Sequence, residues 1–183
     1  MQFQFTTLAI EGLILVEPKV YTDNRGYFLE TYNHAAFTAA GISDLFVQDN
    51  ESYSTAGVIR GLHYQRPPNA QAKLVRVVQG SIWDVAVDLR EDSPTKGKWV
   101  GIELSAENKR QLYLPYWCAH GFYVQSETAL VLYKVSKEYS PENEGGIAWD
   151  DPELAIDWPS KNPGLSARDQ QWHSFSKAVQ HFK

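Results

Sequence analysis

Short segments rich in β-branched and aromatic residues, separated by turn residues at close intervals, limit what this chain can fold into. The clearest is residues 81–89, SIWDVAVDL. Successive side chains of a strand point to opposite faces, so one face should carry Trp83, Val85, Val87 and Leu89, and the other Ile82, Asp84, Ala86 and Asp88. Residues 74–78, 111–114, 121–125 and 129–135 are similar. Many short strands predict a mostly β sandwich or barrel of the jelly-roll kind.

Helix signals are few. Residues 33–40 precede Gly41, and a glycine in this place often ends a helix. Ser166 and Asp169 have the S-x-x-D spacing of a helix N-terminus. No repeat and no Gly/Ser-rich linker divides the chain, so residues 1–183 are expected to form one domain.

Composition excludes several classes of function. The 17 basic and 22 acidic residues give a net charge of −5, and no Lys/Arg run is present, which disfavours nucleic acid and anionic membranes as main partners. The single cysteine, Cys118, excludes an internal disulfide and a cysteine-based zinc or iron–sulfur site. The apolar run at 13–16 is too short for a signal or membrane segment, so a cytoplasmic location is expected.

Two dense clusters contain residues that can carry chemistry. The first, at 57–65, includes Arg60 and His63, and the second, at 114–122, includes His120. Metal-binding cupins often have an H-x-H pair on one strand, but here the pair is His63 and Gln65. A neutral amide is a poor substitute for imidazole at a transition metal, so no metal site is predicted.

Proton transfer is the alternative use of His63, because imidazole titrates near neutral pH. A histidine base works best beside a carboxylate, and Asp84, Asp88 and Asp169 are all candidates. Lys73 can stabilise an enolate oxygen and Tyr133 can act as the acid. Each of these residues also has a purely structural interpretation. His63 can be a hydrogen-bonded side chain and Asp169 a helix cap, while Tyr133 can be a core ring and Lys73 a surface charge.

An ordered set of motifs adds a resemblance. They are 23–31 (DNRGYFLET), 48–50 (QDN), 58–65 (VIRGLHYQ), 73–77 (KLVRV), 80–90 (GSIWDVAVDLR), 93–97 (SPTKG), 104–105, 119–122 (AHGF), 133–134 and 149–152 (WDDP). With these motifs the chain, over about residues 12–169, resembles the dTDP-4-dehydrorhamnose 3,5-epimerase family.

The resemblance implies a cupin-like jelly-roll domain (a double-stranded β-helix) over residues 1–183. N-terminal strands would form a homodimer, and a short helical segment would end the chain. It implies an isomerase without cofactor that inverts C3 and C5 of dTDP-4-dehydro-6-deoxy-D-glucose on the route to dTDP-L-rhamnose. In that reaction His63 is the base, Asp169 polarises it, Lys73 steadies the enolate and Tyr133 is the acid.

The resemblance also assigns residues to the sugar nucleotide: Arg25, Phe28, Glu30, Gln48, Asp49, Asn50, Arg60, His120, Tyr139, Glu144 and Arg168. Tyr139 would stack on thymine, and arginines would bind the diphosphate, which suits their bidentate geometry. Arg25 and Glu30 are expected to serve the pocket of a partner subunit.

Two positions depart from the family's pattern. Trp117 and Cys118 stand where Gly-Phe is common, which predicts a changed turn and pocket wall beside His120 and strain if the backbone has positive φ. Arg168 stands where Lys is common. The alternatives are an epimerase acting at one centre or a ketoisomerase on a related dTDP-hexose, a sugar-nucleotide-binding jelly roll without catalysis, and a metal-dependent cupin.

Overall fold

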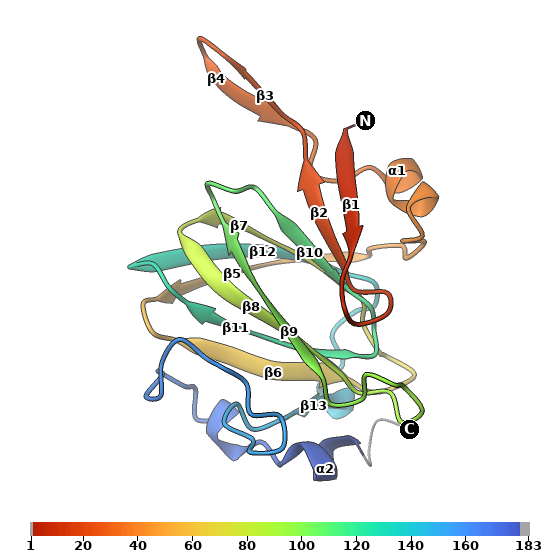
Figure 1. Ribbon diagram of the computed structural model, residues 1–183, viewed down its shortest axis with the longest axis vertical. Helices are drawn as coiled ribbons and strands as arrows, with labels where there is room; N and C mark the ends of the chain where they lie inside the picture. The colour runs from red at the N-terminus through yellow and green to blue at the C-terminus, as the bar shows by residue number, and fades with distance from the viewer. Residues whose placement is uncertain (1, 180–183) are drawn as a thin grey trace.

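Two antiparallel sheets pack face to face around the main core (Figure 1). The structure is a computed structural model that describes residues 2–179. The six-stranded sheet has the order β1 (Phe3–Thr7), β2 (Ile14–Pro18), β10 (Gln111–Leu114), β7 (Lys73–Gln79), β12 (Thr128–Val135), β5 (Gln48–Thr55). The five-stranded sheet has the order β13 (Glu144–Gly146), β6 (Ile59–Gln65), β11 (Cys118–Val124), β8 (Ser81–Asp88), β9 (Trp99–Ser105). The chain crosses between sheets from β5 to β8, and the fold is the predicted cupin-like jelly roll.

The alternation along β8 separates two layers of packing, as the sequence predicts. Ile82 and Ala86 point into the core between the sheets, with Leu112 and Val131 of the opposite sheet. Val85, Val87 and Leu89 belong to a second cluster on the other face. Asp84 and Asp88 therefore lie on the inner face, where each carboxylate needs a partner.

The second cluster is covered by the C-terminal part of the chain, drawn in blue alongside β6 in Figure 1. It contributes Leu154, Trp158 and Phe175 to the cluster and includes the turn η2 (Asp169–Gln171) and helix α2 (Phe175–Ala178). The buried carboxylate of Asp151 accepts hydrogen bonds from the backbone N–H groups of Glu153, Leu154 and Phe175. This segment is thus anchored on both sides of η2.

Local signals at the predicted helix starts are present. Helix α1 (His34–Ala39) begins after Asn33, whose side chain accepts from the backbone N–H of Ala36. The Ser166 hydroxyl accepts from the backbone N–H of Asp169 at 3.0 Å, but only one 3₁₀ turn follows. A further 3₁₀ turn, η1, spans Pro141–Asn143. Within residues 2–179 no helix is long and apolar enough to cross a membrane.

A hairpin of β3 (Val20–Asp23) and β4 (Gly26–Leu29) projects away from the two sheets (Figure 1). Its turn uses Gly26 at φ +130°, a conformation that favours glycine. Phe28 is 69% exposed on it, and Tyr21 and Tyr27 are also exposed. Such apolar exposure on an extended arm is typical of a surface that another molecule covers.

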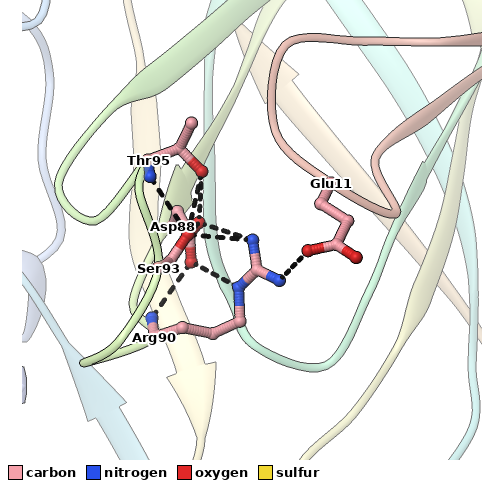
Figure 2. A network of polar contacts seen from close by, with 5 residues as sticks. All are labelled: Glu11, Asp88, Arg90, Ser93 and Thr95. Atoms are coloured by element: carbon pink, nitrogen blue, oxygen red, sulfur yellow. Dashed lines mark hydrogen bonds and ion pairs between the residues drawn. The ribbon is translucent and has the colours of Figure 1, made fainter.

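A polar network closes the end of β8 (Figure 2). The buried carboxylate of Asp88 accepts from the Arg90 guanidinium and from the hydroxyls of Ser93 and Thr95. Although burial raises the pKa of Asp88, these donors together bring it down to about 2. Arg90 also pairs with Glu11 at 2.8 Å, which ties the β1–β2 connection to the β8–β9 loop.

Candidate active site

A cavity of about 430 Å³ opens between the two sheets. Asn50 of β5 and Tyr133 of β12 are paired neighbours, and β7, which carries Lys73, pairs with the other side of β12. His63 lies on β6 in the opposite sheet. Of the predicted site residues, those lining this cavity are Gln48, Asn50, His63, Lys73, Tyr133, Tyr139, Glu144 and Arg168.

His63 is paired with Asp169, 106 positions further along the chain, rather than with Asp84 or Asp88. Its Nε2 atom lies 2.5 Å from Asp169 Oδ1. Nε2–H therefore donates to the carboxylate, and Nδ1 keeps its lone pair for a proton. Within residues 2–179, Nδ1 has no hydrogen-bond partner.

Burial and charge set the protonation of this pair. Burial lowers the pKa of His63, and this outweighs the opposing hydrogen bond and charge of Asp169. Burial raises the pKa of Asp169, but the hydrogen bonds from His63, Trp172 and Ser166 hold it below its usual range. At neutral pH the pair is a neutral imidazole beside a carboxylate, which is the state a general base requires.

Lys73 and Tyr133 face His63 from the six-stranded sheet. Burial lowers the pKa of Lys73 to about 8, against the opposing charges of Asp84 and Glu144, so the ammonium form still dominates at pH 7. Burial raises the pKa of the Tyr133 hydroxyl, against the opposing charges of Arg60 and Arg168. The cavity thus combines a cation with a protonated phenol.

A second histidine–carboxylate pair lies beside the first. His120 of β11 is directly opposite His63 of β6 in the strand register, and its Nε2 atom lies 2.7 Å from Asp84 Oδ1. Both members are buried, and Asp84 Oδ2 has no hydrogen-bond partner within residues 2–179. The inward position of Asp84 in the alternating segment was the sequence signal for a buried carboxylate, but its partner came from another strand.

Hydrogen bonds link the residues at the mouth of the cavity. One oxygen of Glu144 accepts from the Tyr139 hydroxyl at 3.0 Å and from the Arg168 guanidinium at 2.9 Å. The Gln48 side chain accepts from the backbone N–H of Tyr139 and donates to Asn50. Five residues that the resemblance assigned to the nucleotide are therefore joined in one network.

Two other residues assigned to the substrate lie outside the cavity lining. Asp49 points to the outer face of β5, where it pairs with Lys134 at 2.9 Å. Arg60 is exposed and donates to the Ser54 hydroxyl and the Tyr53 carbonyl. No carboxylate within residues 2–179 pairs with Arg60, so its charge is available to an anion.

Arg25, Phe28 and Glu30 also lie away from the cavity of their own chain. Arg25 pairs with Asp23 at the tip of the hairpin. Glu30 accepts from the Asn33 side chain at 3.0 Å. None of the three lines the cavity described above.

The expected change of pocket wall at Trp117 and Cys118 is wrong. Trp117 packs over Gly12, and its ring centroid lies 5.1 Å from the Arg90 Cζ atom. Cys118 is a core residue between the sheets. Neither lines the cavity, and Trp117 has no positive φ, so the predicted strain is absent as well.

Sequence reasoning missed three residues that line the cavity, Tyr64, Gln65 and Gln71, and one that contacts the His63 pair, Trp172. Gln65 donates to the carbonyls of Asn69 and Glu138 and accepts from the Ser140 N–H. Its amide therefore fixes two loops at the rim, which explains a glutamine in the place of a second imidazole.

Comparison with known proteins identifies the family. The sequence model of dTDP-4-dehydrorhamnose 3,5-epimerase matches residues 7–177. The chain belongs to this family of epimerases. It is 55% identical to the dTDP-4-dehydrorhamnose 3,5-epimerase of Pseudomonas aeruginosa over 94% of this chain and 96% of that protein.

Solved members of the family have the same fold. The epimerase of Legionella pneumophila in complex with dTDP-4-keto-L-rhamnose has a TM-score of 0.92 at 46% identity, covering 95% of this chain and 93% of that one. A 3'-monoepimerase of Streptomyces bikiniensis in complex with dTDP-quinovose has a TM-score of 0.89 at 34% identity, and the match covers 94% of this chain and 88% of that one. The epimerase fold thus serves both one-centre and two-centre relatives.

Proposed function

We propose that this epimerase inverts C3 and C5 of dTDP-4-dehydro-6-deoxy-D-glucose to give dTDP-4-dehydro-L-rhamnose, in the cytoplasm and without a cofactor. The observation that carries the proposal is the cavity that places the His63–Asp169 pair opposite Tyr133, with Lys73 beside them. A base and an acid on opposite walls suit removal of a proton from one face of a sugar and its return to the other.

The reaction follows from the substrate's C4 carbonyl, which acidifies the protons on C3 and C5. Nδ1 of His63 takes the proton, and the electron pair of the C–H bond moves onto the C4 oxygen as an enolate. The Lys73 ammonium stabilises that oxygen. The Tyr133 hydroxyl then protonates the carbon from the opposite face. The imidazolium left by the first step and the phenolate left by the second exchange protons with solvent before the second centre reacts.

The network at the mouth is the proposed nucleotide site. Arg168 and Arg60 bind the diphosphate, because guanidinium groups match its oxygens in pairs. Tyr139, half exposed at the rim, stacks on thymine while Glu144 holds its hydroxyl. Gln48 and Asn50 line the sugar end, and the buried His120 lies on the strand next to His63.

The proposed assembly is a homodimer in which the β3–β4 hairpin of each chain reaches the partner's cavity. The exposed Phe28 and Tyr27 on this arm, and the distance of Arg25 from its own cavity lining, support this arrangement. Mixing inactive chains carrying Arg25→Ala/Phe28→Ala with inactive His63→Ala chains should restore about a quarter of wild-type activity, because half the dimers then hold one intact site. Failure to restore activity in a confirmed mixed dimer would reject the exchange.

The test of the function is proton NMR of dTDP-4-dehydro-6-deoxyglucose with catalytic protein in deuterated buffer. Loss of both the H3 and H5 signals, with the L-lyxo product trapped by a reductase, is the expected result. Loss of H3 alone would make this chain a one-centre enzyme, which the similarity to the Streptomyces 3'-monoepimerase keeps as the second candidate. Binding without exchange would indicate a non-catalytic sugar-nucleotide protein.

The same assay separates the acid from the base. Tyr133→Phe should lower product formation by about 10²–10³ while deuterium still replaces the abstracted proton from the same face. Equal loss of exchange and of inversion would show that the hydroxyl only positions the substrate. Tyr53→Phe, at an exposed tyrosine on the outer face of β5, is the matched control.

A further inference from the structure

Trp172 contacts both members of the His63–Asp169 pair without lining the cavity. Its indole N–H donates to Asp169 Oδ1 at 3.1 Å, the same oxygen that lies 2.5 Å from His63 Nε2. Its ring meets the imidazole edge-on, with centroids 6.0 Å apart and an interplanar angle of 71°. The neutral indole has no titratable group in the working range, so this donor is present at every pH at which the histidine titrates.

A space in the backbone accommodates the indole. Gly146 of β13 pairs with His63 of β6, and a Cβ added at Gly146 would lie 2.3 Å from an atom of the Trp172 ring. The residues that follow Gly146 and Trp172 are also fixed. Ile147 and His173 form a parallel β-bridge, and the His173 carbonyl accepts a hydrogen bond from the Ala148 N–H at 2.8 Å. Trp172 is therefore held between η2 and β13, against the bare backbone of Gly146.

We propose that Trp172 is a positioning residue that sets how strongly the Asp169 carboxylate holds the His63 imidazolium, with Gly146 as its seat. A carboxylate oxygen that accepts two hydrogen bonds forms a weaker bond with each donor than an oxygen that accepts only one. The imidazolium that forms on proton abstraction is then stabilised less, and His63 returns more readily to the neutral base. This consequence for turnover rests on the proposed function, whereas the effect on the histidine itself does not.

Apart from Asp169, the charged groups around His63 make no hydrogen bond with the indole within residues 2–179. Lys73 of β7 and Arg168 beside η2 act against its protonation, and Asp169 favours it. His120 of β11, opposite His63 in the register, is held by Asp84. A variant that removes only the indole N–H leaves these charges in place.

The test is a pH titration of ¹⁵N-histidine-labelled full-length protein by NMR, with the His63 signal assigned from a His63→Gln variant. Trp172→Phe keeps an aromatic ring but no donor, and the measured pKa of His63 should rise by about 0.5 to 1 unit. Trp158→Phe is the matched control, because its buried indole donates to the Trp149 carbonyl instead. No shift in Trp172→Phe, or an equal shift in the control, overturns the proposal.

Gly146→Ala provides a second route that leaves the indole in the chain but displaces it. We expect the same upward shift as in Trp172→Phe, and no further shift when the two are combined. Gly101→Ala, whose Cβ would lie 2.4 Å from the Trp83 ring, is the control for a glycine–tryptophan contact elsewhere in the same sheet. If the two shifts in the His63 pKa add, Gly146 and Trp172 act separately, and the proposal that Gly146 holds the Trp172 ring in place is rejected.

These titrations need no substrate, so they keep the two proposals apart. If wild-type protein fails to exchange H3 and H5 but Trp172→Phe shifts the histidine, the substrate is wrong and the positioning role stands. If turnover is present, the acid limb of kcat/KM should move to higher pH by the same shift, with KM unchanged because Trp172 does not line the cavity.

Discussion

The two histidine–carboxylate pairs are neighbours in the sheet but are built differently. His120 and Asp84 come from adjacent strands, β11 and β8, so sheet pairing alone brings them together, and both are buried. His63 receives its carboxylate from η2 in the C-terminal segment, and that oxygen also accepts from Trp172. The Asp84 charge of the His120 pair raises the pKa of Lys73, whereas the His63 pair presents its histidine to the cavity, which His120 does not line. The same two residue types therefore do different work according to the element that supplies the acid.

The largest expected effect is at His63. His63→Ala should lower kcat by about 10³ or more, because it removes the base, while dTDP affinity measured by calorimetry stays nearly unchanged. His34→Ala, at an exposed histidine of α1, is the control. Substantial activity in His63→Ala would move the base to another residue, and His120 would be the next to examine.

Asp169→Asn tests what the η2 carboxylate contributes. The amide can still meet His63, but it no longer stabilises the imidazolium and favours the wrong tautomer, so kcat should fall by about 10²–10³. Circular dichroism and dTDP binding should match the wild type. If kcat stays within threefold of the wild-type value, the charge of Asp169 does not contribute to the reaction and its hydrogen bond to His63 has only a structural role.

Asp84→Asn should act through Lys73 rather than through His63. The Asp84 charge raises the pKa of Lys73, so its loss should move that pKa below about 8. Because the ammonium is the active form, the alkaline limb of kcat/KM should move to lower pH, with about a three- to tenfold loss at pH 8. The acid limb, set by His63, should stay in place and is the internal control. A shift of the acid limb instead would mean that the two pairs are coupled.

The smallest expected effect is at Ser166, whose hydroxyl accepts from the backbone N–H of Asp169. Ser166→Ala should cost about 0.5–1 kcal/mol of unfolding free energy and lower kcat about two- to threefold, because the turn that carries the carboxylate loosens. Ser160→Ala removes a similar contact, to the N–H of Asn162, in the same segment and should leave kcat unchanged. An equal loss of kcat in both variants would show that the position of the Asp169 turn affects the reaction no more than the rest of the C-terminal segment does.

Much of the fold could be predicted from local patterns. The period-two alternation of 81–89 gave the correct faces of β8, since the pleat of a strand leaves no other choice. Asn33 and Ser166 marked turns through hydrogen bonds within three residues of themselves. The resemblance also brought together the residue types of the cavity, although their roles remain predictions.

What the sequence by itself determined is therefore what acts over a few residues: strand faces, caps, turns and the inventory of titratable groups. The tertiary structure decided the partners. Asp84 joins His120 because β8 pairs with β11. His63 meets Asp169 across 106 positions because the turn η2 of the C-terminal segment packs against β6, the strand that lies between β13 and β11. The seat of Trp172 against Gly146 depends on that same strand order. A carboxylate on the inner face must find some partner to offset its burial, but only the packed sheets determine which one.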